Sequence, residues 1–595
     1  MSSSTKLTRA LVDTAMGRVP ADLVIRNGQW VSVQSGEIIP HSDIAIKDGH
    51  IAYVGEDASH AIGKKTKVID AKGRYLVPGL LDGHMHVESG MVTVTEFVRA
   101  VAVRGTTGMF IDPHEIANVF GLKGVKLMVD EAQKQAIHVW VEMPSCVPSA
   151  PGLETPGASI GPKEVAKAMK WKGIIGLGEM MNFPGVFMGD KNMLEEMSIT
   201  HAHGKTIGGH YASLDLGLPF HGYVAGGAED EHEGTRMEDA VIRVRQGMKA
   251  MLRYGSSFLD VASQVGAITQ LGMDSRRFML VTDDSHAGTL THDGHMDRVL
   301  RHAIEQGLNP VTAIQMMTIN TAEHFGVARE MGMIAPGRWA DVVLAKDLNN
   351  FKAEMVIAKG QVIAEGGKWK VSLPKASYPA WVKNSVKLKR KLKTEDFKLQ
   401  VKGSKSKVKA NVIGVIENHV GTRHLTFDVQ PVDGEIKADI SRDLAKIALV
   451  ERHKGTGGIT MGLVTGFGFT AKCAIASTVA HDSHHMIVVG TDEESMAVAG
   501  NSLARSGGGQ VVVRNGKVIG QVELKIAGLM STEKADVVAQ KAETILKGFR
   551  ACGCTLNNPN MQLAFLALVV IPELRISDKG LVDVTKFKFV PVLEE

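Results

Sequence analysis

Residues 76–86 read LVPGLLDGHMH, a short apolar run that ends in the pair His84 and His86. In an extended chain, residues two apart point the same way, so both imidazoles can reach one metal ion. A turn with two exposed histidines is the alternative reading. The position of the pair at the end of an apolar strand favours the metal site.

Seven further apolar runs follow, and each carries His, Glu or Asp at or near its end. They are TTGMFIDPHE (106–115), HVWVEMPSCVP (138–148), GIIGLGEMMN (173–182), KTIGGHY (205–211), GYVAGGAEDEHE (222–233), SSFLDVA (256–262) and FMLVTDDSH (278–286). Segments between them, such as 164–170, 235–247 and 292–306, have helical composition. Eight strands separated by helices predict an α/β fold, a metal-dependent (β/α)8 TIM barrel over residues 78–334. Strand ends converge on one face of such a barrel, where active sites lie.

The barrel is flanked by other segments with a different pattern. Residues 21–77 and 333–368 alternate apolar and polar residues between turn signals such as Asn27-Gly28 and Asp48-Gly49. We expect them to form one small composite β domain from residues 1–77 and 335–376. Residues 377–595 alternate strand-like and helical segments, which predicts an extra C-terminal α/β or α+β domain.

The net charge of +4 over 595 residues is unevenly spread. Residues 383–409 hold eleven Lys or Arg against two acids, so the remainder of the chain is mildly acidic. Such a balance does not suit a protein that binds nucleic acid over its whole surface. Val386, Leu388 and Leu392 alternate with the lysines, and an exposed edge strand protected by charge is the expected structure.

Cysteine content and hydropathy indicate the cellular setting. Four cysteines are too few and too scattered for a disulfide framework or a four-thiolate zinc site. The N-terminal residues lack the long apolar run of a signal peptide, and residues 563–572 are too short an apolar stretch to cross a bilayer. A cytoplasmic protein without a membrane partner is expected.

The polar residues at the strand ends form a candidate set of metal ligands. They are His84, His86, Glu179, His210, His232 and Asp283. This set suffices for two divalent ions bridged by Glu179, and its mixed ligands suit zinc, iron(II) or manganese(II). Two ions would lower the pKa of a bridging water and generate hydroxide near neutral pH. Asp283 could then take the proton of the hydroxide and pass it to a leaving group.

Other clusters leave more than one interpretation open. For the fifth-strand ligand, His201, His203 and His221 are nearby alternatives to His210. The adjacent acids Asp283 and Asp284 point to opposite sides of a strand, so one can face a loop or the substrate. His114, after the second strand, either lines a substrate site or belongs to a turn.

The sequence HDSHH, residues 481–485, is dense in metal-ligating residue types in the predicted C-terminal domain. His481, Asp482, His484 and His485 could bind a further ion or help close the barrel mouth as a lid. A polar turn between two strands is the plainer interpretation. Such a turn requires none of these histidines, which favours a function for the cluster.

The order of the ligands resembles the amidohydrolase superfamily, in which many members carry a carboxylated lysine where this chain has Glu179. The chain is most similar to the bacterial adenine deaminase family, over nearly its whole length. The similar stretches include PGLLDGHMHVESGM, DPHEIANVFG, EMPSCVPSAPGLETPGA, GLGEMMNFPGV, EDEHE, TDDSH, APGRWADVVL, ERHKGTGGITMGLVTGFG and AIASTVAHDSHHMIVVG. Two features depart from the family pattern. One is the region around His210, and the other is Gly90, a position where Ser is common in the family.

The resemblance implies hydrolytic deamination of adenine to hypoxanthine and ammonia, a step of purine salvage. It favours manganese(II) or iron(II) over zinc and implies a homodimer. Glu233 would be the catalytic acid near N1 of the purine, with Glu88 as the other candidate, and Asp283 would carry the proton to the departing amine. Glu88, Ser89, His114 and Asp284 would contact the substrate. An amidohydrolase acting on a cyclic amide or on a different aminated base is the alternative, as is a metal-free scaffold relative.

Overall fold

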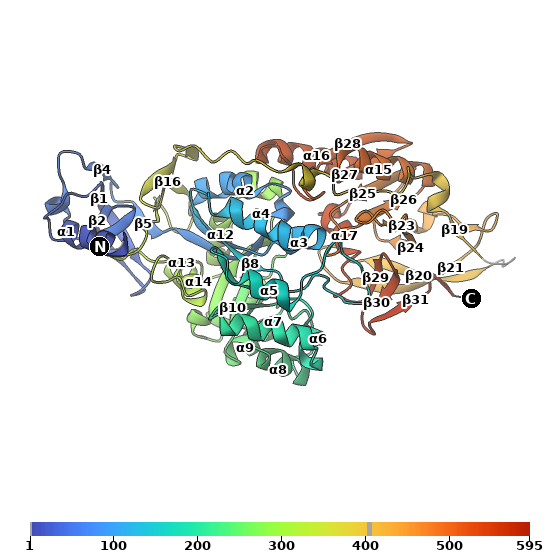
Figure 1. The fold of residues 1–595 in the computed structure, drawn as a ribbon, viewed down its shortest axis with the longest axis horizontal. Helices are drawn as coiled ribbons and strands as arrows, with labels where there is room; N and C mark the ends of the chain where they lie inside the picture. The colour runs from blue at the N-terminus through green and yellow to red at the C-terminus, as the bar shows by residue number, and fades with distance from the viewer. Residues whose placement is uncertain (1–2, 257, 402–406, 595) are drawn as a thin grey trace.

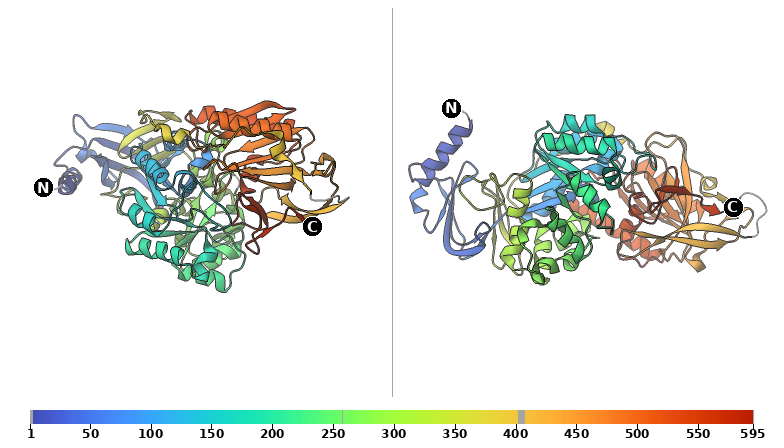
Figure 2. Two further views of the ribbon diagram at one scale, coloured as in Figure 1. Left: turned by 45° about the vertical axis from the view of Figure 1, so that its right-hand side comes forward. Right: turned by 90° about the horizontal axis from the view of Figure 1, so that it is seen from below.

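The computed structural model describes residues 3–256, 258–401 and 407–594. Figure 1 shows three parts along the longest axis: a sheet with the N-terminus at one end, a barrel in the middle, and a C-terminal domain at the other end. The two views of Figure 2 agree with this order. Within the described ranges, the helices are too short or too polar to cross a lipid bilayer.

The central part is a closed barrel of parallel strands. Five strands and a short closing strand form one sheet in the order β10-β9-β8-β7-β6-β14, and β11, β12 and β13 form another. The backbone N–H of Glu229 donates to Ile207 O at 2.9 Å and joins β10 to β11. The strands are β6 (Leu80–His86), β7 (Thr106–Ile111), β8 (His138–Met143), β9 (Ile174–Met180), β10 (Thr206–Gly209), β11 (Asp230–Glu231), β12 (Lys249–Arg253), β13 (Phe278–Val281) and β14 (Asp283–Asp284). The predicted (β/α)8 fold is confirmed.

Helices cover the outside of the barrel, as Figures 1 and 2 show. They include α2 (Val94–Val101), α4 (Leu122–Ala132), α5 (Pro162–Ala168), α7 (Lys191–Ala202), α9 (Met237–Arg245), α12 (Met296–Glu305) and α13 (Pro310–Met316). Because the strands are enclosed on both faces, their sequences are nearly continuous apolar runs, and every residue of β6 is buried. Polar side chains therefore gather at the strand ends.

Two of the predicted barrel strands differ from the structure. The sixth is reduced to β11, because Gly222–Ala225 continue helix α8 (Leu218–Ala225). The seventh was expected at 256–262, but β12 lies earlier, at Lys249–Arg253, and part of the expected segment starts the short helix α10 (Val261–Gln264). Ser257 of that segment lies outside the described residues. The strand KAMLR was missed because a lysine and an arginine bracket only three apolar residues.

The strands before and after the barrel share one sheet. β5 (Tyr75–Pro78), which leads into the barrel, pairs in antiparallel fashion with β15 (Val342–Ala345), which follows it. The other strands are β1 (Leu23–Ser32), β2 (Glu37–Lys47), β3 (His50–Gly55), β4 (Lys67–Asp70), β16 (Ala353–Ala358), β17 (Gln361–Glu365) and β18 (Lys368–Trp369). This pairing ties the two ends of the barrel segment together.

The C-terminal part is a mainly antiparallel sheet with one helix on each face. Val511 and Val513 pack with helix α15 (Glu493–Ser506), whereas the intervening Val512 packs on the side of α16 (Ala535–Ala551). The strands are β20 (Val408–Val415), β21 (Thr422–Val429), β23 (Ala445–Val450), β24 (Ile459–Thr465), β25 (Cys473–Ser477), β26 (Met486–Gly490), β27 (Gly509–Arg514), β28 (Lys517–Glu523) and β32 (Leu593–Glu594). Of the two classes expected for this part, the architecture is α+β.

The lysine-rich segment is not the edge strand that its alternation predicted. Residues 384–393 have no regular secondary structure, and residues 402–406 of the segment lie outside the described part. Leu392 is buried, and Val386 and Leu388 pack beside it against the α15 face of the sheet. The alternation thus reflects an irregular strap whose apolar residues point to the sheet.

Candidate metal centre

Six buried side chains converge at the C-terminal end of the barrel strands, and their exposed fractions lie between 1% and 4%. They are His84 and His86 at the end of β6, Glu179 in β9, His210 after β10, His232 after β11 and Asp283 in β14. The structure therefore brings together the complete ligand set that the sequence predicts. Of the alternatives to His210, His201 and His221 are exposed on the outer helices, and His203 is exposed directly after α7.

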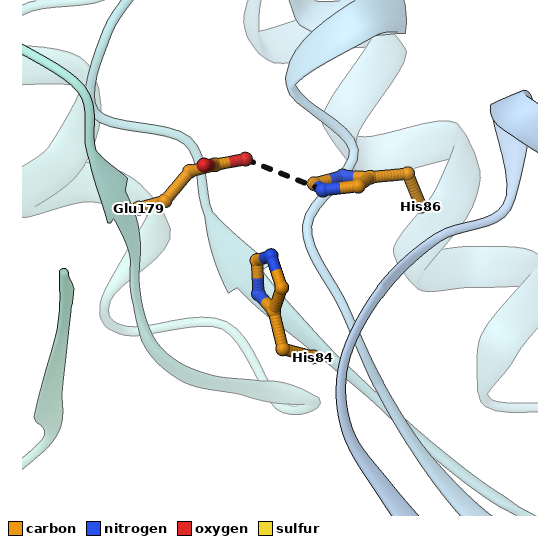
Figure 3. Close-up of side chains that lie close together, drawn as sticks. All are labelled: His84, His86 and Glu179. Atoms are coloured by element: carbon orange, nitrogen blue, oxygen red, sulfur yellow. Dashed lines mark ion pairs between the residues drawn. The ribbon is translucent and has the colours of Figure 1, made fainter. Parts of the chain in front are cut away.

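Glu179 lies between the imidazoles. Its Oε1 lies 3.3 Å from Nε2 of His86, and Figure 3 shows the two side chains facing each other. Its Oε2 lies 2.5 Å from Nδ1 of His210 and 3.2 Å from Nε2 of His232. Each carboxylate oxygen thus has its own histidine partners, an arrangement that suits a bridging ligand of two ions.

Overlapping groups of ligand atoms among the barrel residues have the spacing of metal sites. They include Glu179 with His210 and His232, His84 with His86 and Glu179, and His84 with His232 and Asp283. Among the described residues, the buried Nε2 atom of His84 has no hydrogen-bond partner. A buried imidazole nitrogen without a partner is costly, and a metal ion would satisfy it. The residues present therefore fit two divalent ions.

Backbone groups orient the ligands. The carbonyl of Asp112 lies 2.9 Å from Nδ1 of His86, so this nitrogen donates and Nε2 is left free to bind metal. The carboxylate of Asp112 accepts the backbone N–H of Glu179 at 2.9 Å. The Tyr223 hydroxyl accepts the backbone N–H of His210 at 2.8 Å. The side chains are thus held in place by strand ends and by these polar supports.

The electrostatics favour the metal-binding forms of His84 and Glu179, whereas for His86, His210 and His232 the neighbouring carboxylates outweigh burial and raise the pKa. Burial and the neighbouring His232 and His86 hold the pKa of His84 well below its usual value, so its imidazole is neutral. Burial alone would raise the pKa of Glu179, but His210 and His232 outweigh it and hold that pKa well below the usual value. Neutral imidazole and ionised carboxylate are the ligating species.

Arg253, at the end of β12, lies among the candidate site residues but was not predicted from the sequence. Its Nη1 donates to Glu233 Oε1 at 2.5 Å and to Asp283 Oδ2 at 3.0 Å, and the side chain is fully buried. Burial would raise the pKa of Glu233, but Arg253 and then His210 and His232 lower it overall. The signal was weak, because only three apolar residues precede Arg253 in its strand.

Asp283 itself has a left-handed backbone, with a φ of 58°. This conformation separates β13 from β14, and it is less costly for Asp than for most residues. The side chain then lies between two partners: Oδ1 is 3.4 Å from Nε2 of His86, and Oδ2 accepts from Arg253. Asp283 can therefore serve a metal ion and remain hydrogen-bonded to the guanidinium.

Two of the four predicted substrate-binding residues lie behind the wall of the site. Ser89 contacts the carboxylate of Asp284 and donates to Glu115 Oε1 at 3.3 Å. Glu88 Oε1 accepts the backbone N–H of Ile116 at 3.3 Å. Of the four, Asp284 and His114 line the cavity at the ligands, whereas Glu88 and Ser89 do not. Ser89 thus orients Asp284.

The C-terminal domain covers the mouth of the barrel. The cavity at the ligands has a volume of about 30 Å³, and His481, Asp482 and Phe565 form part of its wall. By contrast, His484 is fully buried within the turn, and Nε2 of His485 donates to Thr155 O at 2.7 Å. The sequence HDSHH therefore divides into two residues that face the site and two that hold the turn.

A larger cavity of about 440 Å³ adjoins the first. Both cavities are lined by Glu233, Val420 and Ile571, so they meet at these side chains. The larger one lies between the barrel and the C-terminal domain and is mostly apolar, with Phe183 and Phe587 among its walls. It offers a route from the surface to the ligands.

Two family models match the chain: the amidohydrolase family over residues 75–363 and the adenine deaminase C-terminal domain over residues 419–588. An adenine deaminase of Mesorhizobium japonicum is 61% identical over 98% of this chain and 97% of its own. The chain belongs to the adenine deaminase family. Adenine deaminase 3 of Rhizobium meliloti is 58% identical over 98% of both chains, and an adenine deaminase of Moorella thermoacetica is 52% identical over 99% of this chain and 98% of its own. Membership of this family implies that the chain uses divalent metal.

Proposed function

We propose that the chain hydrolyses adenine to hypoxanthine and ammonia. The observation that carries the proposal is the convergence of six buried metal-ligating side chains around Glu179 in a member of the adenine deaminase family. Phe258, Phe565 and Ile571 give the small cavity beside the ligands apolar walls, which would contact the faces of a planar base. Purine salvage is the metabolic role that this reaction serves.

The ions would be held by His84, His86, Glu179, His210, His232 and Asp283. Manganese(II) or iron(II) is favoured by the resemblance, and the ligand types also suit zinc. When bound, two divalent ions lower the pKa of a shared water and so supply a nucleophile at neutral pH.

Asp283 and Glu233 would divide the proton transfers between them. The reaction moves one proton of the attacking water to N1 of the purine and the other to the departing amine. Glu233 starts ionised beside Arg253, so it first accepts a proton and then gives it to N1. Asp283, which also accepts from Arg253, delivers the second proton to the amine, and ammonia leaves.

The remaining polar residues of the cavity would position the base. Asp284 is held by Ser89 and faces the cavity, where its carboxylate can accept an N–H of the purine. The larger cavity would admit adenine past Val420 and Ile571. The residue limits 1–77 with 335–376, 78–334 and 377–595 are proposed as the three domains, and a cytoplasmic homodimer is proposed from the resemblance.

The test is release of ammonia by the metal-loaded chain from adenine, guanine, cytosine, adenosine and dihydroorotate. We expect ammonia and hypoxanthine in equal amounts from adenine and no comparable turnover of the others. Turnover of guanine, cytosine or dihydroorotate without turnover of adenine would favour the alternative amidohydrolase function. A chain that binds no metal would favour the scaffold alternative.

A further inference from the structure

A second group of potential ligands lies where the C-terminal domain meets the barrel. His114 begins helix α3 (His114–Phe120), and His481 and Asp482 lie in the turn between β25 and β26. Nε2 of His114 is 3.5 Å from Oδ1 of Asp482, and Nδ1 of His481 is 3.6 Å from the same oxygen. All three side chains are buried, with exposed fractions of 4%, 5% and 1% in that order of chain position.

The polar atoms of this group lack partners. In the described part of the chain, both carboxylate oxygens of Asp482 and both ring nitrogens of His114, one of which faces Asp482, make no hydrogen bond. A buried ionised carboxylate is costly unless a cation or hydrogen-bond donors compensate it. A single cation bound by these side chains would compensate the carboxylate of Asp482 and give a partner to the facing nitrogen of His114.

The separations match a metal ion better than direct hydrogen bonds. A charge-assisted hydrogen bond between imidazole and carboxylate has a length of about 2.7–2.9 Å. Two ligands at about 2.1 Å from one ion, at angles between octahedral and tetrahedral, lie roughly 3.0–3.4 Å apart. The separations of 3.5 and 3.6 Å are closer to the second case and resemble three of the separations among the barrel residues, 3.2–3.4 Å, although Glu179 and His210 lie 2.5 Å apart.

The turn that carries two of the three residues is rigidly held. Arg452 is fully buried and donates to four backbone carbonyls: His484 O at 2.5 Å, Ser385 O at 3.0 Å, Ala527 O at 3.1 Å and Thr478 O at 3.4 Å. His485 donates to Thr155 O at 2.7 Å and fixes the turn to the barrel side. The site is therefore preorganised from both domains, as a metal site requires.

We infer that His114, His481 and Asp482 bind a third divalent transition-metal ion, separate from the pair at Glu179. Two imidazoles and one carboxylate suit manganese(II), iron(II) or zinc, with water in the remaining positions. His114 lies between the two centres, because its Nδ1 is 3.3 Å from Glu179 Oε1 while its Nε2 faces Asp482. The third ion would tie the C-terminal domain to the barrel mouth.

Counting the bound ions tests this inference without any assay on adenine. We expect three manganese ions per chain after the full-length wild type is loaded and passed through gel filtration. Asp482→Asn and His481→Gln keep the side-chain sizes similar and should each retain two. The matched control is His485→Gln, which removes a hydrogen bond between the domains in the same turn and should retain three. Two ions in the wild type, or three in both Asp482→Asn and His481→Gln, would overturn the inference.

Anomalous diffraction at the manganese edge gives an independent test in case either variant fails to fold. Crystals of the loaded wild type should show a third peak between His114, His481 and Asp482, besides two peaks around Glu179. A crystal with both peaks at Glu179 and none at the junction would overturn the inference, and the result does not depend on which substrate the chain accepts.

Discussion

The proposed metal centre of the barrel and the turn at residues 478–485 above it are both rich in histidine and aspartate, but they are built differently. Every ligand around Glu179 comes from, or directly follows, a parallel strand of the barrel. The turn belongs to the C-terminal domain, whereas His114, which lies beside Asp482, belongs to the barrel. Strand ends meet at one face by the geometry of the fold, whereas contacts between domains depend on how two surfaces pack.

The two regions differ in how well the sequence predicts which histidines face the site. In the barrel, adjacency to a strand end is enough to place a side chain in the site. In the turn, His481 and Asp482 face the site while His484 and His485 support the turn, although all four lie within five residues.

Glu179→Gln should have the largest effect. The amide cannot bridge two cations as a carboxylate does, so we expect loss of bound metal and a fall in kcat/KM of more than about 10³-fold. Metal analysis and ammonia release measure the two effects. The control is Glu195→Gln on helix α7, an exposed glutamate that should leave both unchanged. If Glu179→Gln retained both metal and activity, Glu179 would not be the bridging ligand that we propose.

Asp283→Asn separates proton transfer from metal binding. The asparagine keeps its shape beside Arg253 but cannot carry a proton, so we expect kcat to fall by about 10²–10⁴-fold. Most of the metal should remain, because Glu179 and the four histidines are intact. The contrast with Glu179→Gln is the informative measurement. Wild-type kcat in Asp283→Asn would exclude this residue as the proton carrier.

Arg253→Met should have a smaller effect that depends on pH. Arg253 lowers the pKa of Glu233, so its loss raises that pKa. Activity requires ionised Glu233, and the acidic limb of the pH–rate profile should therefore move to higher pH, with kcat reduced by about 10–100-fold. Arg253→Lys restores the charge and should recover part of the shift. An unchanged profile in Arg253→Met would show that the guanidinium does not act through Glu233.

Glu196→Gln should have the smallest effect, and on stability alone. Glu196 on helix α7 is fully buried, and its carboxyl oxygens have no partner in the described structure. Burial raises its pKa to about 9, the opposite direction to Glu179, because no histidines surround it. The stability it contributes is therefore full below its unfolded pKa and is lost as the pH rises toward 9, by about 1.4 kcal/mol per unit.

Replacement by the uncharged glutamine removes this dependence. The melting temperature of Glu196→Gln should exceed that of the wild type by an amount that grows between pH 6 and pH 8. Parallel melting curves over this range would show instead that Glu196 has a partner or is hydrated in solution. Activity on adenine should be unchanged, because the residue lies outside the site.

Much of the fold and ligand set could be predicted because one physical rule governs both. Parallel strands buried on both faces are apolar, so a polar residue at their end stands out, as His84, Glu179 and Asp283 do. The rule failed for β12, where only three apolar residues separate Lys249 from Arg253, and Arg253 was missed with it. It also could not distinguish an irregular strap at residues 384–393 from an edge strand, because both alternate apolar and charged residues.

The covering of the site by the C-terminal domain lay beyond the sequence for another reason. Contact between His114 and Asp482 depends on the docking of two domains, and no spacing along the chain encodes it. The burial of Arg452 under the turn could not be predicted either, because its carbonyl partners come from three segments that are far apart in the sequence.

We propose that the residues around Glu179 bind the metal ions with which this chain hydrolyses adenine. The most direct test is ammonia release from adenine by the chain with and without manganese, with bound metal counted in the same samples. We predict one ammonia and one hypoxanthine per adenine from the loaded chain, and a return to background after chelation. Absence of ammonia from a chain with both sites at Glu179 filled would contradict the account.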